Sequence, residues 1–461
     1  MTTAVLSVCF ENGKTISKVI ISIIFLFILG GVALLISGKP SYAVVCLGIP
    51  IIVAFISHPR AAIYLYIFSM FIFIYPTSSS QLLLIDIVAI VLLVSFGVDF
   101  LLKGRISLKI PSIVKYGLIL LTALVIASIF ATHPEYSYSP LIRVALQLAI
   151  IIAIYNLIFG KDVLILLKLY FWLMVFHSIC NFCSFIVLGG EYRVFGFPGV
   201  YYDDLAMLAF PIGLAYYIWS EKRSDSLLYG LATVLIIFGL LATHSRGPML
   251  TIVWAGFVML VYSRRKAKVG GIDYVRSRIR KLFLGITPIL IILIGFTGIF
   301  RFALERFQSL GDIHSGTIWY RFSLWKASLT SFMSNPFSGI GPGNFRYIES
   351  ILPSLRFNEG MIYVHGLSAH NMFLHYLAES GLIGAAALIA YYLKNFTTSK
   401  NIEKFNSQSF PLPASIAILG VGMTLFFSIF YMDGWGWGQN AFAAPFFFAI
   451  TAKAANSKFN A

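Results

Sequence analysis

Residues 113–131 read IVKYGLILLTALVIASIFA, a stretch in which Lys115 is the only charged side chain. An apolar run of this length crosses the ~30 Å hydrocarbon core of a membrane as one α-helix. Comparable runs of about 17–25 residues recur along the chain. A membrane-spanning β-strand would instead alternate apolar and polar residues over about ten positions. The pattern therefore predicts an all-α fold, a polytopic transmembrane helical bundle.

The composition of the 461 residues agrees with that class, because 59% are hydrophobic and only 11% are charged. Soluble globular domains carry about 25% charged residues. The chain is predicted to contain 12–14 spans. The candidate spans are 16–37, 41–57, 60–76, 81–102, 113–131, 139–159, 161–188, 203–219, 227–243, 248–263, 282–300, 371–394, 411–431 and 439–454.

The spans define three predicted parts of the chain. Residues 1–300 form a first transmembrane bundle, residues 301–370 a structured loop domain outside the membrane, and residues 371–461 the last three spans. The first apolar run, 16–37, is too long for the apolar part of a signal peptide and is followed by no small-residue cleavage site, so we expect it to remain as an anchor.

Basic residues indicate the orientation, since loops rich in Lys and Arg stay in the cytoplasm. Most of the 34 Lys and Arg residues fall on the side of the N-terminus, which predicts that both termini are cytoplasmic. The net charge of +16 is then a topological signal, and we expect no nucleic-acid partner. The cluster Arg264–Lys281 is predicted to lie on the anionic headgroups of the bilayer.

The cations predicted on the outer side are mostly arginines, and only Lys39 and Lys326 are lysines. A guanidinium group binds phosphate oxygens in pairs and keeps its charge when partly dehydrated. This bias favours an anionic substrate such as a diphosphate; the alternative is that arginines contact headgroups or pair with nearby acids. The arginines are Arg143, Arg193, Arg246, Arg301, Arg306, Arg321, Arg346 and Arg356.

The outer segment 301–370 is much longer than most of the other connections, and long ordered loops are usually functional. Within it, residues 317–333 have the pattern of an amphipathic helix that Asn335 and Pro336 end. The glycine-rich stretch 339–343 follows. It could point N–H groups at an anion, or it could be a tight turn between helices at the membrane surface.

Two further stretches hold candidate catalytic groups at the outer end of a span. His370 and Asn371 begin span 371–394, and a neutral imidazole can accept a proton from a hydroxyl. Glu379 lies about 13 Å deeper, where a carboxylate needs a partner and faces the bundle. Arg246 lies at a membrane boundary between Ser245 and Gly247. The structural alternatives are a buried histidine and an interfacial anchor.

The adjacent pair Asp203 and Asp204 raises the possibility of a metal site. Two neighbouring carboxylates at a helix start point in different directions and more often cap the helix. His365 and His370 have no carboxylate ligand set close to them in the sequence. We therefore predict no metal and no other cofactor.

In order along the chain, these motifs resemble the O-antigen ligase and O-antigen polymerase superfamily, over about residues 190–390. The resemblance rests on R-x-x-G at 193–196, S-R-G at 245–247, R-x-x-x-W with N-P-x-x-G-x-G-P-G-N-F over 321–345, and H-N-x-x-L-x-x-x-x-E-x-G-x-x-G over 370–384. Members look like GT-C-type glycosyltransferases in a bacterial inner membrane, with the active site on the periplasmic side. One departure is Tyr202-Asp203-Asp204, where the family often has Asn-Pro-Asn.

The resemblance implies a donor glycan on undecaprenyl diphosphate and an acceptor that is a lipid A core sugar or another glycan. Arg246 and Arg321 match the positions that bind the diphosphate, and His370 matches the base that deprotonates the acceptor. Arg193 is expected to join the donor site. Further candidates for substrate binding are Asn344, Arg346, Asn371 and Glu379.

A metal-independent, inverting transfer fits these residues, because fixed guanidinium groups can stabilise the charge of the leaving diphosphate. The expected activity is that of an O-antigen ligase, with a polymerase that joins lipid-linked repeats as the alternative. A transporter or flippase for the same lipid is the competing class. Such proteins often have repeated halves and charges at mid-membrane, and this sequence shows no repeat.

Overall fold

A computed structural model describes most of the chain from residue 58 onward. The described ranges are 58–71, 84–102, 108–187, 202–243, 245–270, 272–282, 284, 316–348, 368–405, 410–430 and 440–456. Their regular structure is helical and contains no β-strand. Seven helices in these ranges are long and apolar enough to cross a membrane, which confirms the prediction of a polytopic all-α membrane protein. The predicted spans 16–37, 41–57 and most of 282–300 lie outside the described residues.

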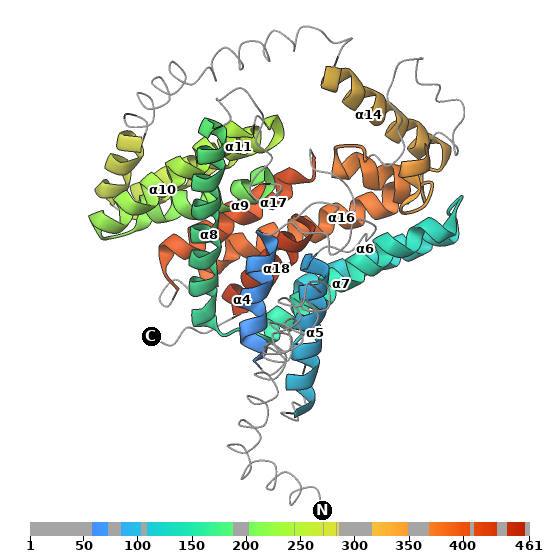
Figure 1. Cartoon of the computed structure of the whole chain (residues 1–461), viewed down its shortest axis with the longest axis horizontal. Coiled ribbons are helices and arrows are strands. Elements are labelled where there is room, and N and C mark those ends of the chain that lie inside the picture. The colour runs from blue at the N-terminus through green and yellow to red at the C-terminus, as the bar shows by residue number, and fades with distance from the viewer. Residues whose placement is uncertain are drawn as a thin grey trace, which may run out of the picture. The chain divides into compact units, whose positions relative to one another are not determined.

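The chain divides into two compact units, Met1–Tyr66 with Asp86–Ser107, and Ile67–Ile85 with Leu108–Ala461. Helix α4 (Pro59–Met70) begins in the first unit, and nearly all of α5 (Leu84–Leu102) belongs to it. The second unit holds all the helices described from Leu108 onward (Figure 1). They are α6 (Ser112–Ile129), η1 (Pro134–Ser137), α7 (Tyr138–Leu157), α8 (Gly160–Val187), α9 (Tyr202–Trp219), α10 (Arg223–Ala242), α11 (Arg246–Gly270), α14 (Gly316–Ser334), η2 (Asn344–Tyr347), α16 (Met372–Phe405), α17 (Leu412–Ser428) and α18 (Asn440–Asn456).

Helix α9 is a core helix of the second unit, because every residue from Leu205 to Trp219 is buried. It packs against α8, α10, α11 and α17. The hydroxyl of Tyr202 joins its first turn to two neighbours, through Ser178 Oγ of α8 at 2.6 Å and the Ile236 carbonyl of α10 at 3.0 Å. A buried helix with an apolar surface all round has no lipid-facing stripe, so its role is to position the helices around it.

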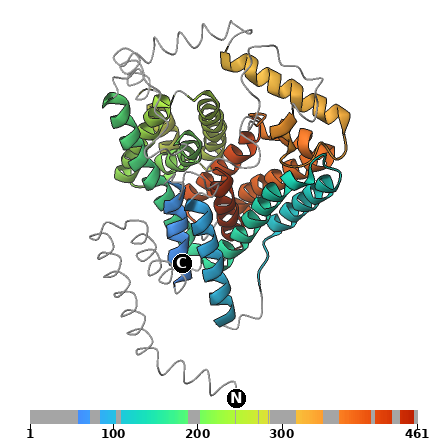
Figure 2. The same cartoon turned by 45° about the vertical axis from the view of Figure 1, so that its right-hand side comes forward.

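Helices α6, α7, α16 and α18 pack together as a second layer, with α6 and α7 side by side in Figure 2. Helix α16 runs past the predicted span 371–394 to Phe405, and its backbone is broken at Gly381 (φ 63°, ψ −164°). Helix α14 occupies the stretch where an amphipathic helix was expected, and it packs on α16.

Segments predicted to share a side of the membrane contact one another at the two ends of this unit. At what we call the outer end, the Thr132 N–H donates to the Ile340 carbonyl at 3.3 Å and the Phe373 N–H donates to the Ile429 carbonyl at 2.9 Å. At the inner end, the Asn156 amide and the backbone of Lys109 exchange hydrogen bonds of 2.8 and 3.1 Å. Which end faces the periplasm remains a prediction.

Candidate functional site

The turn that precedes α16 holds His370 in an unusual conformation. Its φ is +48°, and it is the one residue other than glycine with positive φ among those the structure describes. The Ser368 hydroxyl accepts the His370 N–H at 3.2 Å, and the Asn371 side chain caps the helix by accepting the Leu374 N–H at 3.0 Å. Such backbone strain in an L-residue costs about 1–3 kcal/mol and persists where the surroundings enforce it.

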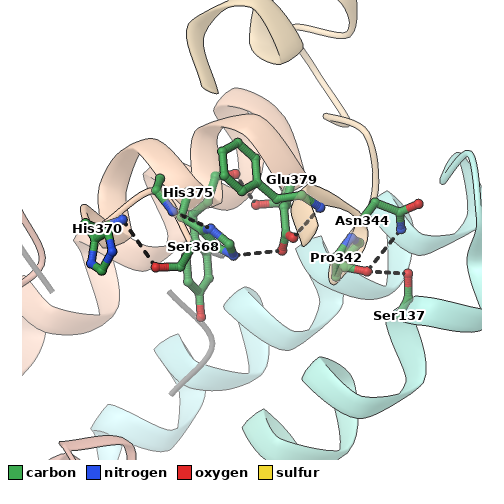
Figure 3. Close-up of polar contacts among 11 residues, drawn as sticks. Ser137, Pro342, Asn344, Ser368, His370, His375 and Glu379 are labelled. Atoms are coloured by element: carbon green, nitrogen blue, oxygen red, sulfur yellow. Dashed lines mark hydrogen bonds and ion pairs between the residues drawn. The ribbon is translucent and has the colours of Figure 1, made fainter. Parts of the chain in front are cut away.

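The backbone of Ala369, directly before His370, is held from two sides. Trp325 of α14 donates its Nε1–H to the Ala369 carbonyl at 3.1 Å. The Ala369 N–H points at Nδ1 of His375, at 3.5 Å. Figure 3 shows His375 between the Ser368–His370 turn and Glu379. Two helices therefore set the position of the His370 backbone, while the side chain of His370 stays half-exposed.

His375 and Glu379 form a fully buried pair one turn apart on α16. Nε2 of His375 lies 3.3 Å from Oε2 of Glu379, and the two side chains are 3% and 0% exposed. Nδ1 of the same ring faces the Ala369 N–H, so the two nitrogens of His375 contact different parts of the chain. His375 is not among the residues predicted from the sequence, although the i, i+4 spacing of His and Glu on a predicted helix is a usable signal.

The Glu379 carboxylate has a second contact, from a different part of the chain. Its Oε1 accepts the Phe345 N–H at 2.9 Å. Burial lowers the pKa of the Arg346 guanidinium, the Glu379 carboxylate works against this lowering, and the positive charge of Arg143 adds to it. Glu379 thus meets the requirement for a partner at this depth, and Arg346 lies between the charges of Glu379 and Arg143.

The glycine-rich turn packs against the break in α16. The N–H groups of Ile340 and Gly341 donate to the carbonyls of Ala378 and Glu379, each at 2.9 Å, and the Leu382 N–H donates to the Pro336 carbonyl at 2.8 Å. These bonds replace helical ones that the break removes. They also occupy the N–H groups of Ile340 and Gly341, so these two do not point at an anion.

Three glycines of this turn, Gly339, Gly341 and Gly343, have φ between 66° and 101°. Gly381, at the break, also has positive φ, and a Cβ there would collide with the backbone of Phe337 and Ser338. The space beside Gly381 is therefore filled by the chain at Phe337 and Ser338.

Asn344 is completely buried and joins the same turn to the loop before η1. Its Oδ1 accepts the His133 N–H at 3.0 Å, and its Nδ2 donates to the carbonyls of His133 and Pro342 at 3.1 and 3.2 Å. Ser137 adds a hydrogen bond to the Pro342 carbonyl at 2.9 Å, as Figure 3 shows. The Asn344 side chain thus makes three structural contacts, and a role in substrate binding stays a prediction.

Arg321 lies on α14 with an exposed side chain. Arg321 precedes Trp325 by four residues, so the two residues share one face of α14 and lie ~6 Å apart along the helix. Trp325 in turn donates to the Ala369 carbonyl. This places Arg321 at the outer end close to the His370 turn.

Arg246 is the first residue of α11, and the structure describes its backbone only. Trp254, two turns later, stacks on Phe427 with ring centroids 5.6 Å apart. Phe427 is two residues before Ile429, whose carbonyl accepts the Phe373 N–H at the start of α16. Arg246 therefore begins its helix at the same end of the bundle as His370. Arg193 lies outside the described residues.

The acidic pair is at the start of α9, where Asp203 accepts the Asp204 N–H at 3.1 Å. This agrees with a role at the helix terminus. No group of three or more His, Cys, Asp or Glu side chains able to hold a metal comes together in the described part of the chain. The absence of a metal from the reaction remains a prediction.

Comparison with known proteins adds one finding. Residues 231–389 match a family model described as O-antigen ligase. The match contains α11, α14, the glycine-rich turn and the first half of α16, which carry the site. No curated protein matches the chain.

Proposed function

We propose that the chain, whose residues 231–389 match the O-antigen ligase family model, is a glycosyltransferase for lipid-linked glycans. The donor is a glycan on undecaprenyl diphosphate, and the acceptor is a sugar hydroxyl of lipid A core. The reaction takes place on the periplasmic side of the inner membrane and uses no metal.

The observation that carries this proposal is the enforced conformation of His370. Its backbone is strained at φ +48°, and Ser368, Trp325 and the His375–Glu379 pair hold the turn around it. A structure that maintains a strained histidine at the start of a membrane helix, half-exposed and beside arginines, is suited to proton transfer from a bound hydroxyl.

In the proposed step, the imidazole of His370 takes the proton of the acceptor hydroxyl as its oxygen attacks the anomeric carbon of the donor. The bond between that carbon and the diphosphate oxygen breaks, and undecaprenyl diphosphate leaves with the electron pair. One displacement inverts the anomeric centre. A positioned base contributes roughly 10²–10⁴ to such a rate.

Arg321 and Arg246 are the proposed clamp for the leaving diphosphate, with Arg193 as a further donor contact. Arginine suits this role because its planar group binds two phosphate oxygens and stays charged. Removal of one fixed donor to a developing oxyanion typically costs ~3–4 kcal/mol, or about 10²–10³ in rate. Asn371, Asn344, Arg346 and Glu379 are assigned to supporting the site.

The test is transfer by the purified full chain in lipid nanodiscs, with a chelator present. His370→Ala and Arg321→Ala are each expected to reduce the rate at least about 100-fold while the melting temperature stays within a few degrees. Lys326→Ala is the matched control, since Lys326 is exposed on the same helix as Arg321. Full activity in either site variant, or loss of activity on chelation alone, would refute the mechanism.

The product distinguishes the proposed ligase from the polymerase that shares its motifs. A ligase yields lipid A core that carries the glycan, whereas a polymerase yields a longer lipid-linked chain. Mass spectrometry of the lipid products from one reaction that contains both acceptors reads out the two outcomes. A longer lipid-linked chain as the main product would replace the ligase assignment.

A further inference from the structure

A second polar site lies at the inner end of the bundle, far from His370. It is a cavity of about 230 Å³ between the start of α6, the middle of α16 and the end of α18. Asn395 in its wall is 25 residues after His370, roughly 38 Å of helix at 1.5 Å per residue. That length exceeds the ~30 Å thickness of the hydrocarbon core, so we expect the cavity near the opposite membrane surface. The polar residues that line it are Ser112, Lys394, Asn395, Thr398, Asn401, Thr451 and Asn456.

Asn395 indicates that this cavity holds a ligand. Its side chain is 1% exposed, and in the described structure neither Oδ1 nor Nδ2 has a hydrogen-bond partner. Buried amide groups are almost always paired, because an unpaired one loses its bonds to water without replacement. A polar molecule in the cavity would supply both partners.

The charges around the cavity favour an anion. The first turn of α6 begins at Ser112, and no side chain caps this helix end, which leaves N–H groups and the positive end of the helix dipole at the cavity. Lys394 contributes a cation, with its Nζ 5.7 Å from the ring of Tyr116. No Asp or Glu is among the residues that line the cavity. Hydroxyl, amide, ammonium and N–H donors around one space match the oxygens of a phosphate group.

An apolar groove of about 580 Å³ lies along α6 and α16, two of the helices that line the cavity. Its walls include Leu118 and Ile119 of α6 and Ala386 and Ala390 of α16. Ala390 is one turn before Lys394 and so lies on the same face of α16. A polar, positively charged cavity at the end of an apolar groove has the form of a phospholipid: a phosphate headgroup followed by an acyl chain.

We propose that α6, α16 and α18 form a specific binding site for a phospholipid of the inner-end leaflet. The phosphate lies between the α6 N-terminus, Lys394 and Asn395, and one acyl chain lies in the groove of α6 and α16. Basic cavities between transmembrane helices bind lipid headgroups in this way. The site is separate from the proposed transfer reaction, and it fixes the inner half of the helix that carries His370 at its other end.

Native mass spectrometry of the full chain in detergent, with added phosphatidylglycerol, measures this site. We expect one retained lipid, with binding about tenfold weaker after Asn395→Leu or Lys394→Gln. Lys400→Gln is the control, because Lys400 is exposed on the same helix and outside the cavity. Asn395→Leu also removes the unpaired amide, so the lipid-free variant should melt no lower than the wild type. If wild-type protein retains no lipid, or if Asn395→Leu and Lys394→Gln bind as the control does, the site does not exist.

A second variant separates a lipid from a free phosphate. Ala386 is exposed in the groove, and Ala386→Phe fills the space for the acyl chain without changing a polar group. It should weaken phosphatidylglycerol binding while the stabilisation by inorganic phosphate in a thermal melt is unchanged. Unchanged phosphatidylglycerol binding in Ala386→Phe would show that only the phosphate is recognised, and the lipid assignment would be wrong.

Discussion

Replacing His375 by leucine removes both polar contacts of this ring and keeps most of its volume. The Ala369 N–H loses its acceptor, and Glu379 keeps the Phe345 N–H at 2.9 Å but loses the imidazole nitrogen that lies 3.3 Å from its Oε2. Leaving a buried polar group without a partner typically costs about 1–3 kcal/mol. The long 3.5 Å contact to Ala369 adds little, so we expect a loss of stability of about 2 kcal/mol.

The same substitution should reduce catalysis by the folded protein. His370 directly follows Ala369, whose carbonyl is held by Trp325 and whose N–H is held by His375. Displacing a reacting group by ~1 Å can cost about 100-fold in rate. We expect kcat to fall 10- to 100-fold in His375→Leu, with little change in the KM for the donor.

Two variants make the result decisive. His375→Gln can accept the Ala369 N–H through its amide oxygen and donate to Glu379 through its amide nitrogen, so it should recover most of the stability and activity. Leu388→Ala removes a fully buried side chain from the same helix and should cost about 2–5 kcal/mol without affecting kcat. Melting temperature and transfer rate are measured for all three. Equal kcat in His375→Leu and Leu388→Ala, or no recovery in His375→Gln, would refute a positioning role.

Three further predictions concern the contacts around α16. Gly381→Ala should destabilise the protein by more than ~2 kcal/mol in a melting assay, since the residue has positive φ and a Cβ would meet the Phe337 backbone. Gly97→Ala on α5 is the control, because a Cβ there meets open space, and it should be neutral or slightly stabilising. Asn344→Leu should lower the free energy of unfolding by about 2–4 kcal/mol because it leaves the His133 backbone unpaired. Increased protease cleavage near residue 340 would report release of the turn, and unchanged cleavage would contradict the role of Asn344 as the link to η1. Arg346→Met should destabilise the protein by ~2–3 kcal/mol because it removes the cation beside Glu379. The double variant with Glu379→Gln should recover part of this loss, and additive effects in the double-mutant cycle would exclude the interaction.

The sequence alone determined the membrane class and most helix positions. Runs such as 113–131 can satisfy their backbone groups inside lipid only as helices, so length and composition suffice to place them. The helix over 317–333 and the location of His370 at the start of a span also follow from local patterns, because caps, helix breakers and amphipathic spacing act over a few residues.

Only the tertiary structure decided which polar groups meet. The Glu379 carboxylate binds the N–H of a residue 34 positions away, and Asn344 binds His133 across 211 positions. The break at Gly381 exists because the turn over 336–341 supplies hydrogen bonds to α16 that the helix gives up. The unpaired Asn395 and the cavity that it lines arise where three helices converge. Such contacts depend on how helices pack, which a hydropathy pattern does not specify.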